Sequence, residues 1–159
     1  MDKEKTIQLL TYVIQRHSKA TRTVLMKLAY LIDLTSVKKT GNMISEFEYK
    51  RYIYGPYDPA ITTLLTTLEE SRTVKGIEDY TVYGDEFIRY ELFEVDTALE
   101  FDKLSDNECR IIDTVLEELK GYGAKALTDI AYQTPPMKKI GATRGGIEHF
   151  NEKLDLYCD

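Results

Sequence analysis

Hydrophobic and polar positions recur at helical spacing through the first forty residues of the chain. Between residues 4 and 17, apolar side chains stand three or four positions apart, which places them on one face of a helix. The segment 22–38 has the same periodicity but too many apolar positions for one stripe, so its helix is expected to lie nearly surrounded by the fold. This helix is predicted to end before Gly41, where Lys38 and Lys39 suit the negative end of the helix dipole.

Helical periodicity is lost between residues 42 and 55. β-Branched and aromatic residues are frequent there, so the segment is predicted to be irregular or briefly extended and to stop at Gly55-Pro56. The next helix has a clear start, because Asp58 can cap it and Pro59 fits the first helical position, where an N–H has no partner. Four apolar side chains of this helix are expected to face inward: Ile61, Leu64, Leu65 and Leu68.

Strands are predicted after Ser71, where apolar and polar residues begin to alternate. The pattern favours strands over Thr73–Ile77 and Phe87–Val95. Tyr80–Tyr83, which precedes Gly84-Asp85, could form a third strand. These segments together predict a small antiparallel hairpin.

The last third of the chain is predicted to return to helix. Ser105 and Glu108 have the spacing of a capping box, which starts a helix that Gly121 or Gly123 closes. A short helix follows over residues 124–132, and Pro135-Pro136 stops it. A last helix is expected around Ile147–Leu156, after the break at Gly145-Gly146.

These elements predict a single domain over residues 1–159, of the α+β class and mainly α: a compact helical domain with a small antiparallel β-hairpin or short sheet. Hydrophobic residues make up 43% and charged residues 30% of the chain, which argues against disorder. The apolar runs are far shorter than the roughly 20 residues that cross a bilayer. Two cysteines form no disulfide framework, and no signal peptide is visible at the N-terminus, so we expect a cytoplasmic protein without membrane association.

The net charge of −6 is unevenly distributed along the chain. Residues 1–60 carry ten Lys or Arg and six Asp or Glu, whereas residues 61–159 carry eleven and twenty-one. This asymmetry indicates either two binding surfaces of opposite charge or, as the favoured interpretation, solvated helix faces of different composition. The acidic balance makes nucleic-acid binding unlikely, since binding to phosphates requires clustered Lys and Arg.

The residue patterns that usually support catalysis are missing from the sequence. The chain has no glycine-rich phosphate loop, and its two histidines, His17 and His149, have no further metal ligand at helical spacing. Cys109 lies within an apolar helix and is interpreted as a small core residue rather than a nucleophile. We therefore expect no enzyme activity, no cofactor and no metal.

Two local features stand out against this background. Lys27, Tyr30 and Asp33 line one side of the most apolar helix, either as a solvated polar stripe or as a buried and specifically paired set. Tyrosines at positions 49, 52, 54 and 57 surround Gly55-Pro56. Such tyrosines suit a protein interface, although packing around a tight turn is slightly favoured.

The order of these features resembles a known family. The run Leu25-Met26-Lys27-Leu28-Ala29-Tyr30-Leu31-Ile32-Asp33, followed by Tyr54-Gly55-Pro56-Tyr57 and later by Leu127-Thr128-Asp129-Ile130-Ala131-Tyr132, is similar to the Panacea domain, also described as SocA-like or phage-associated GepA-like. The resemblance spans roughly residues 5–140. The chain departs from it at Tyr132, where the family often has histidine, and at Met137, where it often has tryptophan.

The resemblance implies an antitoxin that neutralises a cognate toxin by direct binding, or an adaptor that delivers the toxin to a Clp-type protease. Toxin–antitoxin genes of this kind occur in bacteria, phages and mobile elements. The oligomeric state stays open. The expected partner-binding residues are Lys27, Tyr30, Asp33, Tyr54, Gly55, Pro56, Tyr57 and Tyr132.

A DNA-binding transcriptional regulator is the alternative function. The capped helix, the glycine turn and the short helix over residues 124–132 are compatible with a helix-turn-helix motif. That second helix offers only Lys125 as a cation, next to Asp129, so contacts to phosphates and bases would be poorly supplied.

Overall fold

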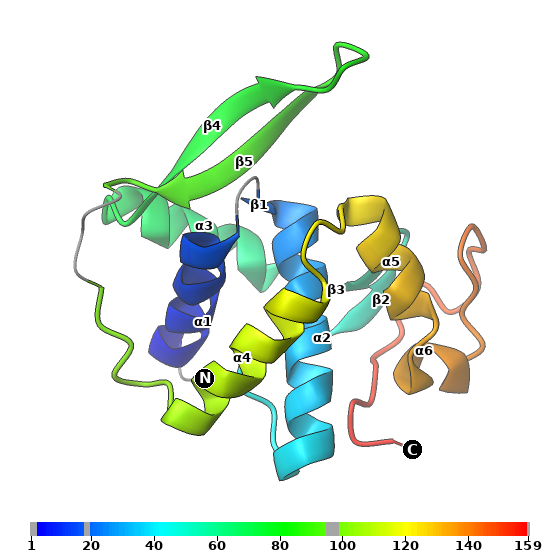
Figure 1. The fold of residues 1–159 in the computed structure, drawn as a ribbon. Coiled ribbons are helices and arrows are strands. Elements are labelled where there is room, and N and C mark those ends of the chain that lie inside the picture. The colour runs from blue at the N-terminus through cyan, green and yellow to red at the C-terminus, as the bar shows by residue number, and fades with distance from the viewer. Residues whose placement is uncertain (1–2, 18–19, 95–98, 159) are drawn as a thin grey trace.

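A computed structural model describes residues 3–17, 20–94 and 99–158 of the chain. Helices are the predominant secondary structure, and the strands are short except for one hairpin (Figure 1). In chain order the elements are α1 (Lys3–Arg16), β1 (Ala20–Thr21), α2 (Arg22–Thr40), β2 (Lys50–Tyr52), β3 (Gly55–Tyr57), α3 (Ala60–Glu70), β4 (Val74–Tyr80), β5 (Glu86–Leu92), α4 (Asp106–Glu118), α5 (Ala124–Tyr132) and α6 (Pro135–Lys139). The α+β class with a mainly helical content is therefore confirmed.

Helix α2 runs through the middle of the molecule and packs against α1, α4, α5 and β3 (Figure 1). The side chain of Thr21 caps its start by accepting a hydrogen bond from the Val24 N–H, at 3.2 Å. Gly41 ends it with a φ of 83°, a conformation in which its N–H bonds to the Val37 carbonyl. The expectation that this helix is surrounded by the fold is confirmed, since its buried residues lie on all sides.

Most of the other predicted helices are confirmed, with small shifts at their ends. The capping box forms between Ser105 and Glu108 at the start of α4. The end of α4 differs from the prediction, because the helix closes at Leu119, whose N–H bonds to Val115 and Glu117, before either glycine is reached. Helix α3 begins one residue late, with the Asp58 carboxylate accepting from the Ala60 N–H at 2.9 Å.

Two antiparallel sheets form, one with strand order β1-β5-β4 and one with only β2 and β3. The predicted strands after Ser71 are confirmed as β4 and β5, although Val95 lies outside the described residues. The prediction of a third strand over Tyr80–Tyr83 is wrong. Tyr80 ends β4, and the next residues turn, with the Gly84 N–H bonded to the Thr81 carbonyl at 2.9 Å and Gly84 at a φ of 87°.

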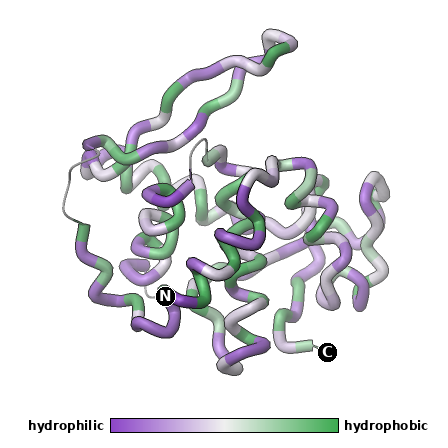
Figure 2. The backbone as a smooth tube through the Cα atoms, viewed as in Figure 1, coloured by the Kyte–Doolittle hydropathy of each residue, from purple (hydrophilic) through white to green (hydrophobic). Residues whose placement is uncertain are grey.

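The β4–β5 hairpin projects from the helical body (Figure 1). Only its root is covered: Val74, Tyr90 and Leu92 are buried there, whereas residues near the tip are exposed. Hydrophobic and hydrophilic positions are interspersed along both strands, including the projecting part (Figure 2).

The helix expected around Ile147–Leu156 is wrong, because this segment pairs with β2 instead. The Leu154 N–H bonds to the Tyr49 carbonyl at 2.9 Å, and the Arg51 N–H bonds to the Glu152 carbonyl at 2.9 Å. Asn151, at a φ of 65°, turns the chain at this point. Backbone groups that a helix would pair internally are therefore used by the neighbouring strand.

No helix in the described part of the chain is both long enough and apolar enough to cross a bilayer.

Candidate functional site

The polar residues of α2 are buried rather than solvated. Lys27 is 1% exposed, and Tyr30 and Asp33 are 0% exposed. Burying a charge is costly unless it is hydrogen-bonded, so each of these groups requires a specific partner. The solvated stripe is thus the wrong interpretation, and the specifically paired set is the correct one.

Asp33 connects α2 to the segment that follows it. One carboxylate oxygen accepts from the Ile44 and Ser45 N–H groups at 2.8 and 2.9 Å, and the other accepts from the Ser45 hydroxyl and, at 2.6 Å, from the Tyr49 hydroxyl. Burial raises the pKa of the Asp33 carboxyl, while these hydrogen bonds act in the opposite direction. The pKa of Tyr49 is raised by burial and by the nearby carboxylate.

Tyr30 belongs to the core between α2 and the start of α6. Its hydroxyl lies 2.7 Å from the Thr134 hydroxyl, and its ring meets the Tyr49 ring edge-on with centroids 5.2 Å apart. Burial raises the pKa of Tyr30. Neither Tyr30 nor Asp33 offers surface to a partner, so any part they take in binding is through positioning of other residues.

Lys27 holds the start of β3, where Gly55-Pro56 follows the two-residue turn at Ile53 and Tyr54. Its Nζ donates to the Pro56 carbonyl at 2.8 Å. Burial, with a smaller effect from nearby Arg144, lowers the pKa of Lys27 to about 8. Gly55 has a φ of 97°, in the region that favours glycine, and a Cβ there would lie 3.6 Å from the Lys27 Cε and 3.5 Å from the Tyr132 ring.

Tyr132 supports the same turn from α5. Its hydroxyl donates to the Ile53 carbonyl at 3.1 Å and lies 3.4 Å from the Tyr52 carbonyl. The ring is 4% exposed, so it forms the back of the turn rather than its surface. Where the family often has histidine, this chain therefore has a residue that anchors the β2–β3 hairpin.

Arg51 is a second buried cation beside this hairpin. Its Nη2 donates to the Thr143 and Gly146 carbonyls at 3.1 and 2.6 Å, and its guanidinium carbon lies 5.6 Å from the centroid of the Tyr132 ring. The Arg51 Nε and Nη1 atoms have no hydrogen-bond partner among the described residues. The region around the turn is therefore rich in positive charge.

An apolar pocket of about 230 Å³ opens at the surface of the β2–β3 hairpin. We call it the aromatic pocket. Tyr54, Ile53 and Phe150 are 66%, 61% and 50% exposed around it. The Tyr52 ring, which also lines it, is edge-on to the rings of Tyr57 and Phe150, at centroid distances of 5.1 and 5.3 Å. The lining residues are Thr23, Lys27, Tyr52, Ile53, Tyr54, Tyr57 and Phe150.

The structure thus divides the expected binding residues into three groups. Lys27, Tyr54 and Tyr57 line the aromatic pocket. Gly55 and Pro56 begin β3, and Tyr132 supports the hairpin from α5. Tyr30 and Asp33 are buried in the core. The tyrosine cluster is also divided, because Tyr49 is buried in the core and Tyr54 is exposed at the surface.

Sequence reasoning missed Ile53, Arg51 and Phe150. For Arg51 the sequence offered one signal, its position two residues after Tyr49, because alternate residues of a strand face the same side. Phe150 gave no signal, because it reaches the pocket through the unexpected pairing of the C-terminal segment with β2.

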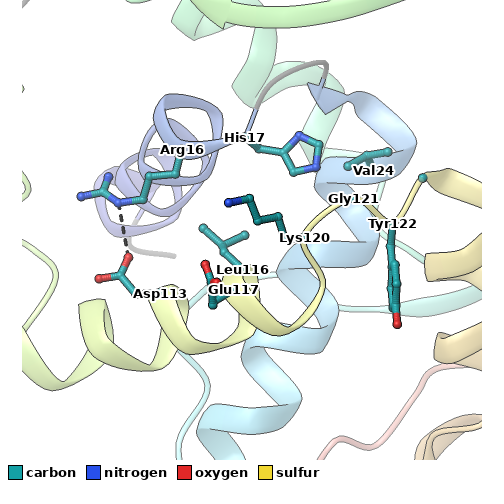
Figure 3. Close-up of a pocket in the computed structure, with 10 residues that line it drawn as sticks. Arg16, His17, Val24, Asp113, Leu116, Glu117, Lys120, Gly121 and Tyr122 are labelled. Carbon is teal, nitrogen blue, oxygen red and sulfur yellow. Dashed lines mark ion pairs between the residues drawn. The ribbon is translucent and has the colours of Figure 1, made fainter.

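A larger cavity, of about 610 Å³, lies between the end of α1, the start of α2 and the end of α4 (Figure 3). Charged side chains of both signs surround it, including Lys120, Glu117 and the ion pair between Arg16 and Asp113, with 3.3 Å between Nε and Oδ1. Among the residues that the structure describes, its lining contains one histidine, His17, and one hydroxyl group, that of Tyr122.

The two histidines lie in different places. His17 lines the cavity of Figure 3, whereas the His149 Nδ1 lies 2.7 Å from Glu152. No three His, Cys, Asp or Glu side chains of the described segments are grouped to hold a metal ion. Cys109 is partly buried against the core, and burial raises the pKa of its thiol, which makes the thiolate less accessible.

Comparison with known proteins identifies one family. No curated protein and no solved structure matches the chain. The family model described as "Antitoxin SocA-like, Panacea domain" matches residues 25–136, which include most of α2, the β2–β3 hairpin, α4 and α5 but not Phe150. Because this match covers most of the chain, the protein belongs to the SocA-like Panacea antitoxin family.

Proposed function

We propose that the chain is an antitoxin that neutralises a cognate toxin by direct binding and that the aromatic pocket is a contact surface for that toxin. The observation that carries this proposal is the exposure of Ile53, Tyr54 and Phe150 around a concave, apolar site. Exposed aromatic residues next to a pocket are typical of interface hot spots, because they bury a large area at low entropic cost.

The support beneath the pocket also favours a binding role. Lys27 and Tyr132 hold the backbone of residues 52–56 through side-chain hydrogen bonds from α2 and α5. A surface held in place in this way loses little conformational freedom when a partner binds. The family membership supplies the class of partner, a toxin.

The test is co-purification of the chain with the product of the adjacent gene, together with rescue of growth in cells that express that product. Tyr54→Ala is expected to weaken binding about tenfold or more, as truncation of an interface aromatic does. Tyr157→Ala is the matched control, because Tyr157 is 58% exposed but lies outside the aromatic pocket. The pocket assignment fails if both variants bind alike, and the antitoxin assignment fails if the wild-type chain neither binds nor rescues.

The half-life of the toxin in the same cells separates two modes of action. Neutralisation by binding alone leaves the toxin at its normal level in an inactive complex. An adaptor for a Clp-type protease would shorten the toxin's half-life, and deletion of the protease would restore it.

The DNA-binding alternative receives less support from the surface of α5. Leu127, Thr128 and Tyr132 of this helix are buried, and its one cation, Lys125, is accompanied by Asp129, which pairs with Arg144 at 2.6 Å. A recognition helix requires several cations or amides directed at the groove. A sequence-specific mobility shift would favour this alternative.

A further inference from the structure

The two faces of the β4–β5 hairpin differ in charge. Residues paired across antiparallel strands have side chains on the same face, and the face alternates from one pair to the next. On one face the pairs are Lys75 with Glu91, Ile77 with Arg89 and Asp79 with Phe87. Arg89 forms ion pairs with Asp79 at 3.1 Å and with Glu91 at 2.7 Å, and the Lys75 Nζ lies 3.6 Å from a Glu91 carboxylate oxygen. The positive and negative charges of this face are therefore paired with each other.

The other face is buried at its root and open in its outer half. Val74, Tyr90 and Leu92 form the buried root. Beyond them Glu78 pairs with Ile88, and Tyr80 pairs with Glu86. Ile88 is 45% and Tyr80 is 62% exposed, and the turn beyond adds Val82 at 95% and Tyr83 at 90%. We call the set Glu78, Tyr80, Val82, Tyr83, Glu86 and Ile88 the outer hairpin face.

Carboxylates on this face lack cationic partners. Glu78 and Glu86 form no ion pair with any residue that the structure describes, and both cations of the hairpin lie on the opposite face. Glu69 of α3 adds a further carboxylate near Gly76, at the boundary with the root. Arg22 of α2 lies at the root near Tyr90 and donates to Thr62.

We propose that the outer hairpin face docks into a basic, partly apolar cleft of the toxin, as a second contact that rests on the proposed antitoxin function. Exposed aromatic residues between unpaired carboxylates fit a surface that offers both cations and an apolar recess. The projection of the hairpin from the body gives it the reach to enter a cleft (Figure 1).

Other occupants fit this face less well. Nucleic acid and anionic membranes would be repelled by Glu78 and Glu86. A second copy of the chain, related by a two-fold axis, would bring the same carboxylates against their own equivalents. A basic protein surface is the occupant that the charge of the face favours.

The experiment measures the affinity of the chain for the product of the adjacent gene by calorimetry at low and moderate salt. Glu78→Lys combined with Glu86→Lys is expected to weaken binding about 30-fold at low salt, because charge complementarity becomes repulsion. The loss should shrink as salt screens the charges. Glu46→Lys combined with Glu118→Lys is the control, since it makes the same change in net charge at exposed positions, between α2 and β2 and at the end of α4, away from the hairpin.

A second variant tests the apolar half of the face. Tyr80→Ser combined with Tyr83→Ser is expected to weaken binding about tenfold at all salt concentrations. Because these side chains are exposed, the melting temperature of each variant should stay within about 3 °C of the wild type. A lower melting temperature with unchanged affinity would contradict the docking role.

The outcomes separate this inference from the function on which it rests. Equal affinity of the wild type, the hairpin variants and the control overturns the hairpin contact and leaves the antitoxin function intact. Equal loss in the hairpin and control variants also overturns it, because the effect would then come from net charge alone. Absence of any wild-type complex overturns both, and self-association that only the hairpin variants abolish assigns the face to a second copy instead.

Discussion

Asp33 shows how one buried side chain can fix the path of a long irregular segment. Its carboxylate accepts four hydrogen bonds from Ile44, Ser45 and Tyr49, and so determines where the chain runs between α2 and β2. The sequence marks Asp33 only as a polar residue in an apolar helix. Its partners could not be predicted, because they belong to a segment without periodicity.

Asp33→Asn is expected to lower the free energy of unfolding by about 3 kcal/mol, because an amide cannot accept from all the donors that surround it. Urea denaturation measures this change. Asp129→Asn is the control and should change the free energy by less than about 1 kcal/mol, because that carboxylate is half exposed. Equal effects of the two substitutions would contradict the role given to Asp33.

The lowered pKa of Lys27 predicts that the free energy of unfolding depends on pH. Its pKa is about 8 in the folded chain and 10.5 for an ordinary lysine, so between these values the unfolded chain binds more protons. Stability should therefore rise with pH across this window, by about 2 kcal/mol between pH 7 and 9.5 from this group alone.

The test compares the wild type with Lys27→Met at each pH, so that the tyrosines and other titrating groups cancel. The difference in the free energy of unfolding should move in favour of the wild type as the pH rises from 7 to 9.5. A difference that is flat over this range would show that Lys27 titrates normally in the folded chain.

Among the elements, the helices are the part that the sequence predicts well. Apolar periodicity and the capping box locate α1, α2, α4 and α5 because both signals are local. The predicted C-terminal helix is wrong because its segment pairs with residues 49–51, a long-range contact that local patterns do not contain. The sequence predicts only part of the aromatic pocket for the same reason. Tyr54 belongs to the local tyrosine cluster, whereas Phe150 belongs to the distant C-terminal segment.

The β2–β3 turn gives a prediction at the scale of an element. Gly55→Ala is expected to cost about 1 to 2 kcal/mol of stability, because the φ of 97° is strained for any side chain. Gly123→Ala should change the free energy of unfolding by less than about 0.5 kcal/mol, since its φ is −86° and no atom lies near an added Cβ. Thermal or urea denaturation of both variants measures the contrast.

At the scale of the whole molecule, the uneven charge of the sequence has a structural counterpart. Within the described segments, the lining of the aromatic pocket contains Lys27 and no carboxylate, whereas the outer hairpin face carries Glu78 and Glu86 and no cation. The two surfaces therefore suit different parts of a partner. Both surfaces are already formed in the structure of the chain without a partner.

Amide hydrogen exchange, compared between the free chain and its complex with the toxin, tests most directly whether the chain binds through these two preformed surfaces. We predict slower exchange on binding at residues 52–57 and 78–88, with the amides of α2 already protected in the free chain and changed little. Slower exchange confined to other segments, or a general gain of protection throughout α2, would contradict recognition by a preformed surface.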